Sequence, residues 1–221
     1  MEQSSVATEA DLLVGRPVLL VVDIQQDVLL PAAQSGIARA GGQAQVITGA
    51  EALVAAARAA RVPVIFTQEA HRSTGVDFGR ELDGAESEHC LEDEPSTALW
   101  PTLVPRSDRG QHEYVVVKRR YSAFFGTDLD ILLRGLGAQT LVLAGNLTDV
   151  CIHYTFVDAH QHDYHVRVVE DCVVGSSTAR HDSALDAMEY LQHGARRSSG
   201  AVIEAFRSCR SWLPELAEVG R

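Results

Sequence analysis

The sequence lacks a long hydrophobic run and has few cysteines. Its longest purely aliphatic stretch, Val18–Val22, is far too short to span a bilayer, and no apolar leader segment comes before it. The four cysteines, Cys90, Cys151, Cys172 and Cys209, form no C-x-x-C pair and show no regular spacing, which argues against a disulfide framework. We therefore expect a cytoplasmic protein that does not insert into a membrane.

Basic residues are also scarce. Lys and Arg number 19 against 30 Asp and Glu, which gives a formal net charge of −11 and disfavours binding to the phosphate backbone of nucleic acids. No G-x-G-x-x-G motif follows a strand-like segment, so a dinucleotide cofactor is not expected either. These absences leave small molecules as the expected partners, with no bound cofactor.

What the sequence does have is enough apolar residues for one core. At 221 residues and 46% hydrophobic content, a single domain over residues 13–210 can fold without disulfides or metal, and residues 1–12 and 211–221 are expected to be loosely anchored ends. Periodicity predicts strands at 17–23, 63–67, 114–118, 140–144, 165–169 and, briefly, 201–203, and helices at 44–61, 127–136, 149–162 and 179–192. This alternation predicts an α/β fold with three α/β/α layers and a mostly parallel, doubly wound sheet of about six strands.

Three reactive residues stand at equivalent places in that pattern. Asp23 ends the first predicted strand, Lys118 ends the third, and Cys151 follows the fourth at a turn into a helix. The carboxyl ends of parallel strands share one edge of a sheet, so the three side chains are expected to converge. A helix start lowers the pKa of a thiol, which favours Cys151 as a nucleophile, with Asp23 as proton shuttle and Lys118 holding both anions. Backbone N–H groups of Leu147 and Cys151 would face the oxyanion.

The motifs around these residues resemble the isochorismatase-like cysteine hydrolases. The matching pieces are Leu20–Asp27, Val117–Leu129 and Gly145–Cys151, and the resemblance runs from about Val18 to Ile203. It implies an Asp-Lys-Cys amidohydrolase that cleaves a C–N bond of a small amide, ureide or carbamoyl compound through a thioester-type intermediate. It also implies a cis peptide between Asn146 and Leu147. Relatives that lack the cysteine cleave the vinyl ether of isochorismate, so Cys151 disfavours that reaction here.

The resemblance also bears on ligands. Substrate contacts are expected from residues near the three motifs, namely Gln25, His71, Tyr121, Phe124, Asn146 and Tyr154. The nicotinamidase branch binds a divalent metal through Asp-x-His and a later histidine, whereas this chain has Thr67-Gln-Glu-Ala-His71-Arg, so we expect no metal. The group His160-x-His162-x-x-His165 is interpreted as a helix end.

The connection from 69 to 111 is long and is expected to form the rim of the site. Seven acidic residues fall between positions 81 and 94, which leaves two substrate classes open. One is a neutral ureide or carbamoyl compound, and the other is a cationic lactam or amide of the streptothricin type. A catalytically silent homologue that only binds a metabolite is the third alternative. Relatives commonly form dimers or tetramers, so a homodimer or homotetramer is expected, with the face near 154–156 as its contact.

Overall fold

The fold is built on one parallel sheet. In a computed structural model that describes residues 12–106 and 112–209, six strands pair in the order β3-β2-β1-β4-β5-β6, and every registered pair is parallel. The strands are β1 Pro17–Val22, β2 Val64–Glu69, β3 Glu113–Lys118, β4 Thr140–Asn146, β5 His165–Val174 and β6 Arg196–Arg197. This confirms the predicted α/β class and number of strands.

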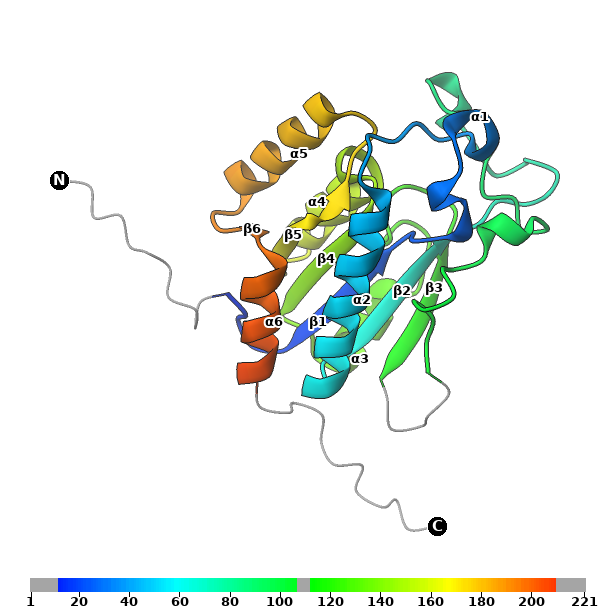
Figure 1. Cartoon of the computed structure of the whole chain (residues 1–221). Coiled ribbons are helices and arrows are strands. Elements are labelled where there is room, and N and C mark those ends of the chain that lie inside the picture. The colour runs from blue at the N-terminus through cyan, green and yellow to red at the C-terminus, as the bar shows by residue number, and fades with distance from the viewer. Residues whose placement is uncertain (1–11, 107–111, 210–221) are drawn as a thin grey trace, which may run out of the picture.

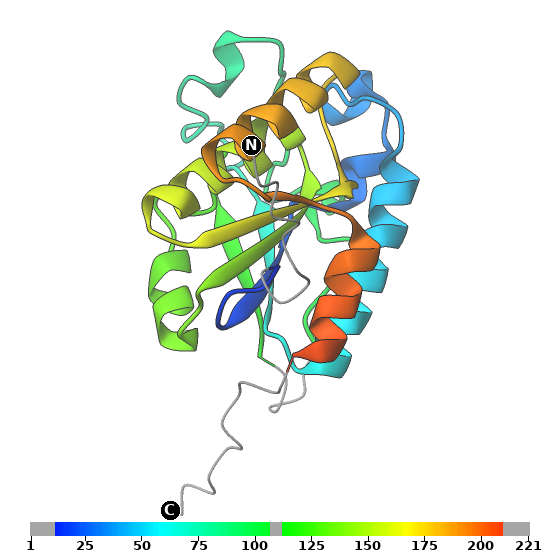
Figure 2. The ribbon, with the colours of Figure 1, turned by 90° about the vertical axis from the view of Figure 1, so that its left-hand side faces the viewer.

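Helices cover both faces of the sheet (Figures 1 and 2). On one face lie α2 Gln43–Ala60 and α6 Ser199–Ser208; on the other lie α3 Leu129–Leu136, α4 His153–Gln161 and α5 Thr178–Leu191. Alternate side chains of β1 enter opposite cores: Leu19 packs with α2 and α6, whereas Leu20 packs with α3, α4 and α5. Burial on both faces explains why the strands are continuously apolar in the sequence.

Two predicted elements differ in the structure. Residues 201–203 belong to α6 rather than to a strand, because the Ser198 hydroxyl accepts a hydrogen bond from the Ala201 N–H and caps a helix that buries Val202 and Phe206. The sixth strand is instead β6. The helix predicted from 149 begins with a π-helical turn, Thr148–Ile152, and becomes α-helical only at His153.

The long connections lie over the carboxyl ends of the strands (Figure 1). After β1 come a 3₁₀ turn, Gln26–Leu29, and the short helix α1, Ala32–Ser35; between β2 and β3 lie the 3₁₀ turns Glu81–Asp83 and Pro95–Thr97. The predicted rim segment is therefore ordered where it is described, up to residue 106. Bridges Gln25–Leu99 and His71–Leu91 attach it to the sheet edge.

The predicted loose ends fall almost entirely outside the described residues. Leu12 is the exception: it is buried, and its carbonyl accepts a hydrogen bond from Arg167. Within residues 12–106 and 112–209, no helix combines the length and apolar character that crossing a membrane requires.

Candidate active site

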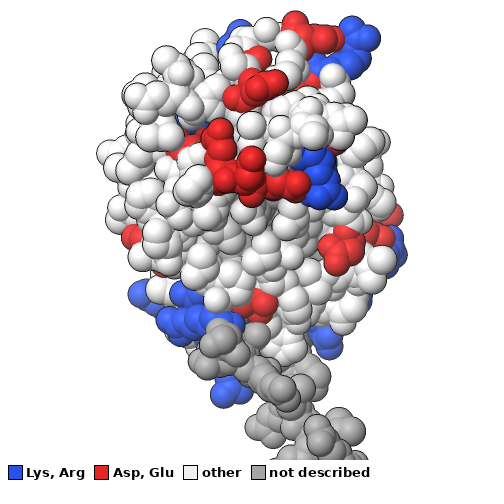
Figure 3. Space-filling view, turned by 90° about the vertical axis from the view of Figure 1, so that its right-hand side faces the viewer, with Lys and Arg blue, Asp and Glu red and all other residues white. Residues whose placement is uncertain are grey.

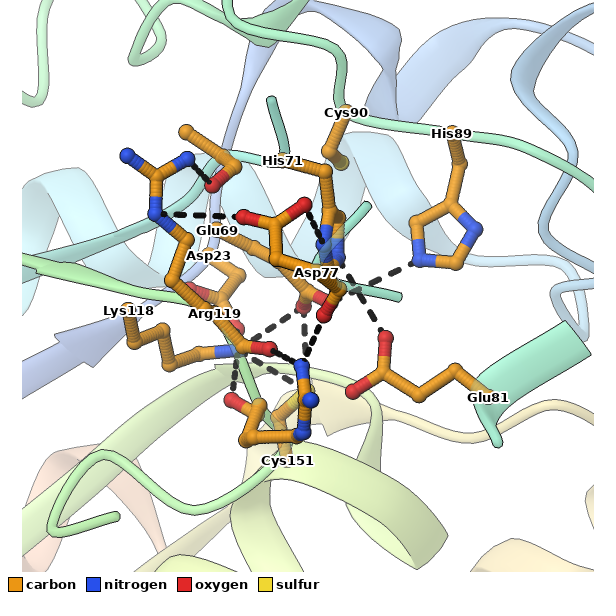
Figure 4. Close-up of polar contacts among 12 residues, drawn as sticks. Asp23, Glu69, His71, Asp77, Glu81, His89, Cys90, Lys118, Arg119 and Cys151 are labelled. Atoms are coloured by element: carbon orange, nitrogen blue, oxygen red, sulfur yellow. Dashed lines mark hydrogen bonds and ion pairs between the residues drawn. The ribbon is translucent and has the colours of Figure 1, made fainter. Parts of the chain in front are cut away.

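Asp23 and Lys118 form an ion pair at the carboxyl edge of the sheet (Figure 4). The Lys118 Nζ lies 2.8 Å from Asp23 Oδ2, and the lysine side chain is fully buried. Asp23 directly follows β1 with φ of 49°, a conformation that costs energy in a residue other than glycine. Thr67 on β2 holds it there, since the Thr67 hydroxyl donates to Asp23 Oδ1 at 2.6 Å.

A second carboxylate, Glu69 at the end of β2, shares the same lysine. Glu69 Oε2 lies 2.8 Å from Lys118 Nζ, because β2 pairs directly with β3 and brings the two residues opposite each other. Cys151 completes the group: its Sγ is 3.4 Å from Lys118 Nζ and 3.6 Å from Glu69 Oε2. The structure therefore brings Asp23, Lys118 and Cys151 together, with Glu69 as a fourth member that was not among the residues predicted from the sequence.

Burial and charge shift the pKa values of these groups. Burial raises the pKa of Asp23 above its ordinary value, despite the attraction of Lys118. Burial also acts on Glu69, but Lys118, His71 and His89 outweigh it and hold the Glu69 pKa well below the usual range. For Lys118, burial also opposes the charged form, but the nearby anions outweigh it and raise the Lys118 pKa well above normal. The lysine is a fixed cation between two carboxylates.

The prediction of a lowered pKa for Cys151 is wrong. Burial raises the pKa of this thiol well above its ordinary value; Lys118 lowers the pKa and Glu69 and Asp23 raise it, and the effect of burial prevails. The side chain is 6% exposed and sits in a five-residue π-helical turn rather than in the first turn of a long helix. Cys151 therefore rests as a thiol and needs a base to become a nucleophile.

The turn that carries Cys151 is fixed by close packing and side-chain hydrogen bonds. Gly145 has φ of 126°, and a Cβ there would lie 2.0 Å from the Val22 carbonyl oxygen, so only glycine fits. The peptide bond between Asn146 and Leu147 is cis. The Asp149 carboxylate accepts from the Ser176 N–H at 2.8 Å, which ties the turn to the loop after β5.

A cavity of about 30 Å³ adjoins the thiol, enough for roughly two water molecules. Its walls are Asp23, Gln25, Asp27, Ile37, Arg39, Glu69, Glu86, His89, Cys90, Tyr121, Asn146, Leu147, Val150 and Cys151. Of the residues predicted to contact substrate, Gln25, Tyr121 and Asn146 line it.

The other predicted contacts lie elsewhere. His71 is fully buried behind the wall, Phe124 stacks on His162 with ring centres 5.2 Å apart, and Tyr154 stacks on Tyr121 at 5.6 Å without lining the cavity. Proximity to a motif in the sequence therefore did not place these three side chains in the cavity wall. In the same region, His162 stacks on Phe124 whereas His160 contacts Gln192, so these two histidines have different partners.

Four buried side chains, one of them Glu69, converge in the way that metal ligands do. Donor atoms of Glu69, His71, Glu81 and His89 all lie within 4.8 Å of one another. His71 Nε2 is 3.3 Å from both Glu69 Oε1 and Glu81 Oε2, and His89 Nε2 is 3.5 Å from Glu69 Oε1. Ligands around a tetrahedral zinc ion lie about 3.3–3.4 Å apart, so these separations match such a site.

The chemistry of the four donors also fits a cation. Glu81 is buried with Oε1 lacking a hydrogen-bond partner in the described part of the chain, and Oε2 has only the 3.3 Å contact with His71. Burial lowers the pKa of His71, yet the two carboxylates outweigh it and raise that pKa to about 9. The expectation of no metal depended on the missing Asp-x-His motif. Glu69 stands in this chain where that motif has its aspartate, and His89 follows later and contacts Glu69, so the absence of metal stays a prediction to be tested.

The acidic segment between 81 and 94 is only partly available to attract a cationic substrate. Figure 3 shows acidic side chains mainly on the upper part of one face, with Lys and Arg among them. Arg72 and Arg119 both contact Glu92, at 3.2 and 3.3 Å, and Arg80 contacts Asp83 at 2.7 Å. Local ion pairs therefore offset part of this negative charge.

Comparison with known proteins agrees with this geometry. A family model described as the isochorismatase domain matches residues 17–201. The chain belongs to the isochorismatase family. A family relative, maleamate amidohydrolase from Pseudomonas putida, is 31% identical over 196 residues, which cover 80% of this chain and 88% of that protein.

Further members of the isochorismatase family show the same relationship. Ureidoacrylate amidohydrolase RutB from Methylobacterium radiotolerans is 31% identical over 173 residues, or 69% of this chain and 65% of that one. Among solved structures, a cysteine hydrolase from Pseudomonas syringae superposes with a TM-score of 0.74 at 27% identity, covering 87% of this chain and 93% of that chain.

Several residues of this isochorismatase-family site were not found from the sequence. Glu69 and His89 carried a signal, since Glu69-Ala-His71 with a later histidine is the family's metal pattern with glutamate in place of aspartate. Arg39 carried none, and Glu86 was noted only as one of the acidic residues between 81 and 94. They lie on loops without periodicity, and only the folding of those loops over the strand ends brings them to the cavity.

Proposed function

We propose that the protein is a cysteine-dependent amidohydrolase that cleaves a C–N bond, other than a peptide bond, in a small amide or ureide. The contact of one buried lysine with both Asp23 and Cys151, at 2.8 and 3.4 Å, is the observation that carries this proposal. The family membership supports it, as do the names of relatives that act on maleamate and on ureidoacrylate.

In the first half of the reaction, Asp23 accepts the thiol proton and Cys151 Sγ attacks the carbonyl carbon. The proton transfer moves negative charge from Asp23 to Cys151, and both positions are beside Lys118, so the net charge of the buried group stays constant. Burial is the main cause of the raised pKa values of Asp23 and Cys151, and the charge of Glu69 adds to both, so each group favours its protonated form until the proton is transferred.

In the second half, Asp23 returns the proton to the departing nitrogen and the C–N bond breaks, which leaves an acyl group on Cys151 as a thioester. Asp23 then deprotonates a water molecule that attacks the thioester carbonyl, and the Cys151 thiol is regenerated. The N–H groups of Leu147 and Cys151 are proposed to stabilise the oxyanion in both steps. The Leu147 carbonyl accepts hydrogen bonds from Val150 and Ile152, at 3.1 and 3.0 Å, which holds this turn in place.

The test is a panel of primary amides, ureides and lactams, with ammonia release measured for the first two and ring opening, which yields a new amine without ammonia, measured for the lactams. Cys151→Ala is expected to abolish release while the far-ultraviolet circular dichroism spectrum stays unchanged. Trapping the acyl group on Cys151 by acid quench and mass spectrometry tests the thioester directly. Turnover by a folded Cys151→Ala protein at the wild-type rate would refute the covalent mechanism, and a wild-type protein inert to the whole panel would favour a binding homologue.

A divalent cation is a second candidate ligand of this site, supported by the four converging donors. Glu69, His71, Glu81 and His89 would hold it, and when bound it would supply Lewis-acid charge next to the Glu69–Lys118 pair. Metal analysis of the purified protein, followed by titration of chelated protein with zinc and manganese, tests this. A His89→Ala variant is the control and is expected to lose stoichiometric binding. Equal metal content in both proteins would count against the site.

A further inference from the structure

The Asn146 side chain is buried in the cavity wall without a hydrogen-bond partner. It is 4% exposed, and within residues 12–106 and 112–209 neither Oδ1 nor Nδ2 is paired. An unpaired buried amide destabilises a folded protein, so such groups are uncommon unless a ligand or water satisfies them. Asn146 also ends β4, five positions before the nucleophile. Asn146 and the Cys151 thiol therefore line the same cavity.

Other polar groups of the same wall are already occupied. The Gln25 amide donates to the Glu69 and Thr97 carbonyls, at 2.9 and 2.7 Å, and accepts from the Glu69 N–H at 2.9 Å. Asp23 and Glu69 share Lys118. Asn146 is thus positioned to offer both a donor and an acceptor to a bound molecule.

The charges near Asn146 disfavour an anionic group. Arg39 lines the same cavity as Asn146. The next residue, Ala40, is fixed close to the end of β5, because its N–H donates to the Gly175 carbonyl at 2.8 Å. Gly175 follows Val174, which pairs with Asn146 in the sheet. The Arg39 guanidinium is 2.7 Å from Asp27 Oδ2, so an anion on the protein already matches its charge. A substrate carboxylate would therefore compete with Asp27 for Arg39, whose buried Nε is the one guanidinium nitrogen without a hydrogen-bond partner in the described part of the chain.

We propose, on the basis of the amidohydrolase function above, that Asn146 selects substrates with a second amide edge whose C=O and N–H lie on the same side. Primary carboxamides, ureido ends and lactam rings have this edge and pair with Nδ2 and Oδ1 together. A carboxylate has no N–H for Oδ1 and meets it with like partial charge. The scissile carbonyl is assigned to the Leu147 and Cys151 N–H groups, so the group read by Asn146 is a second one.

Maleamide and maleamate provide a matched pair, because they share one skeleton and differ only in carboxamide against carboxylate at one end. Wild-type protein is expected to release ammonia from maleamide with kcat/KM at least about 10-fold higher, the effect of two hydrogen bonds. Asn146→Leu should lower that ratio at least about 10-fold and raise Tm, because it removes the unpaired amide. Asn146→Ala repeats the test with a side chain that cannot clash.

A wild-type ratio near one, or a ratio unchanged in both Asn146 variants, would overturn the inference. A lowered Tm with an unchanged ratio would overturn it too, since Asn146 would then act only on the fold. Calorimetric binding of maleamide and maleamate to Cys151→Ala protein needs no turnover, so it separates failure of the selectivity inference from failure of the proposed amidohydrolase function. Preference for maleamide there supports the inference even without turnover, and equal or absent binding of both refutes it.

Discussion

The Lys118→Met substitution is expected to cost a large part of the protein's stability. Methionine keeps the length of the side chain but removes the charge, and the lysine is fully buried with Asp23 and Glu69 carboxylates each 2.8 Å from its Nζ. Removing one partner of a buried ion pair costs about 3–5 kcal/mol, because a charge is left in a medium that solvates it poorly. Two carboxylates are left here, so the loss should lie toward the upper end.

Urea denaturation and thermal melting measure this loss. For a chain of this size, about 3–5 kcal/mol corresponds to a fall in Tm of roughly 6–20 °C. Arg134→Met is the matched control: its ion pair with Asp130 is equally short, 2.8 Å, but its side chain is 66% exposed, so solvent screens the pair and little change is expected.

A second variant tests whether stranded charge is the cause. Adding Glu69→Gln to Lys118→Met removes one of the two unpaired carboxylates, so the double variant should be more stable than Lys118→Met alone. The reasoning would be refuted if Lys118→Met unfolded at the wild-type urea midpoint. It would equally fail if the two substitutions added their separate costs.

Three further predictions concern the base, the thiol and the turn. Asp23→Asn should lower the rate by about 10²–10⁴-fold. In the wild-type protein, activity should fall as the pH drops through the raised Asp23 pKa, and the variant should lack this acid limb of the pH–rate profile. If the variant kept the acid limb, another group would be its cause. Iodoacetamide at neutral pH should modify the half-buried Cys209 faster than Cys151, because burial raises the Cys151 pKa. Peptide mass spectrometry measures the order, and faster labelling of Cys151 would contradict the conclusion that Cys151 rests as a thiol. Gly145→Ala should destabilise the protein by at least about 2 kcal/mol in urea, whereas Gly135→Ala, with open space for its Cβ, should stabilise it slightly; equal effects would contradict the close approach to Val22.

The sequence by itself determined the class of the fold and the meeting of three chemically reactive side chains. Continuous β-branched runs alternating with amphipathic stretches can be satisfied only by buried parallel strands under helices, and this pattern is local enough to be recognised in the chain. It also determined that Asp23, Lys118 and Cys151 would meet, because strand ends in a parallel sheet lie on one edge. Residues 201–203 show the limit of such reasoning. Three apolar residues fit the periodicity of a strand and that of a helix equally well, and the Ser198 cap makes them helical in the structure.

The tertiary structure alone decided what surrounds those residues. The strand order puts Glu69 opposite Lys118, and the loop between β2 and β3 brings His89 against Glu69; neither contact has a local sequence signal, since each joins residues about twenty or more positions apart. The state of the thiol was decided there too. A turn motif predicts a lowered pKa for Cys151, but burial and two neighbouring carboxylates raise it, and desolvation depends on the whole packed environment rather than on the motif.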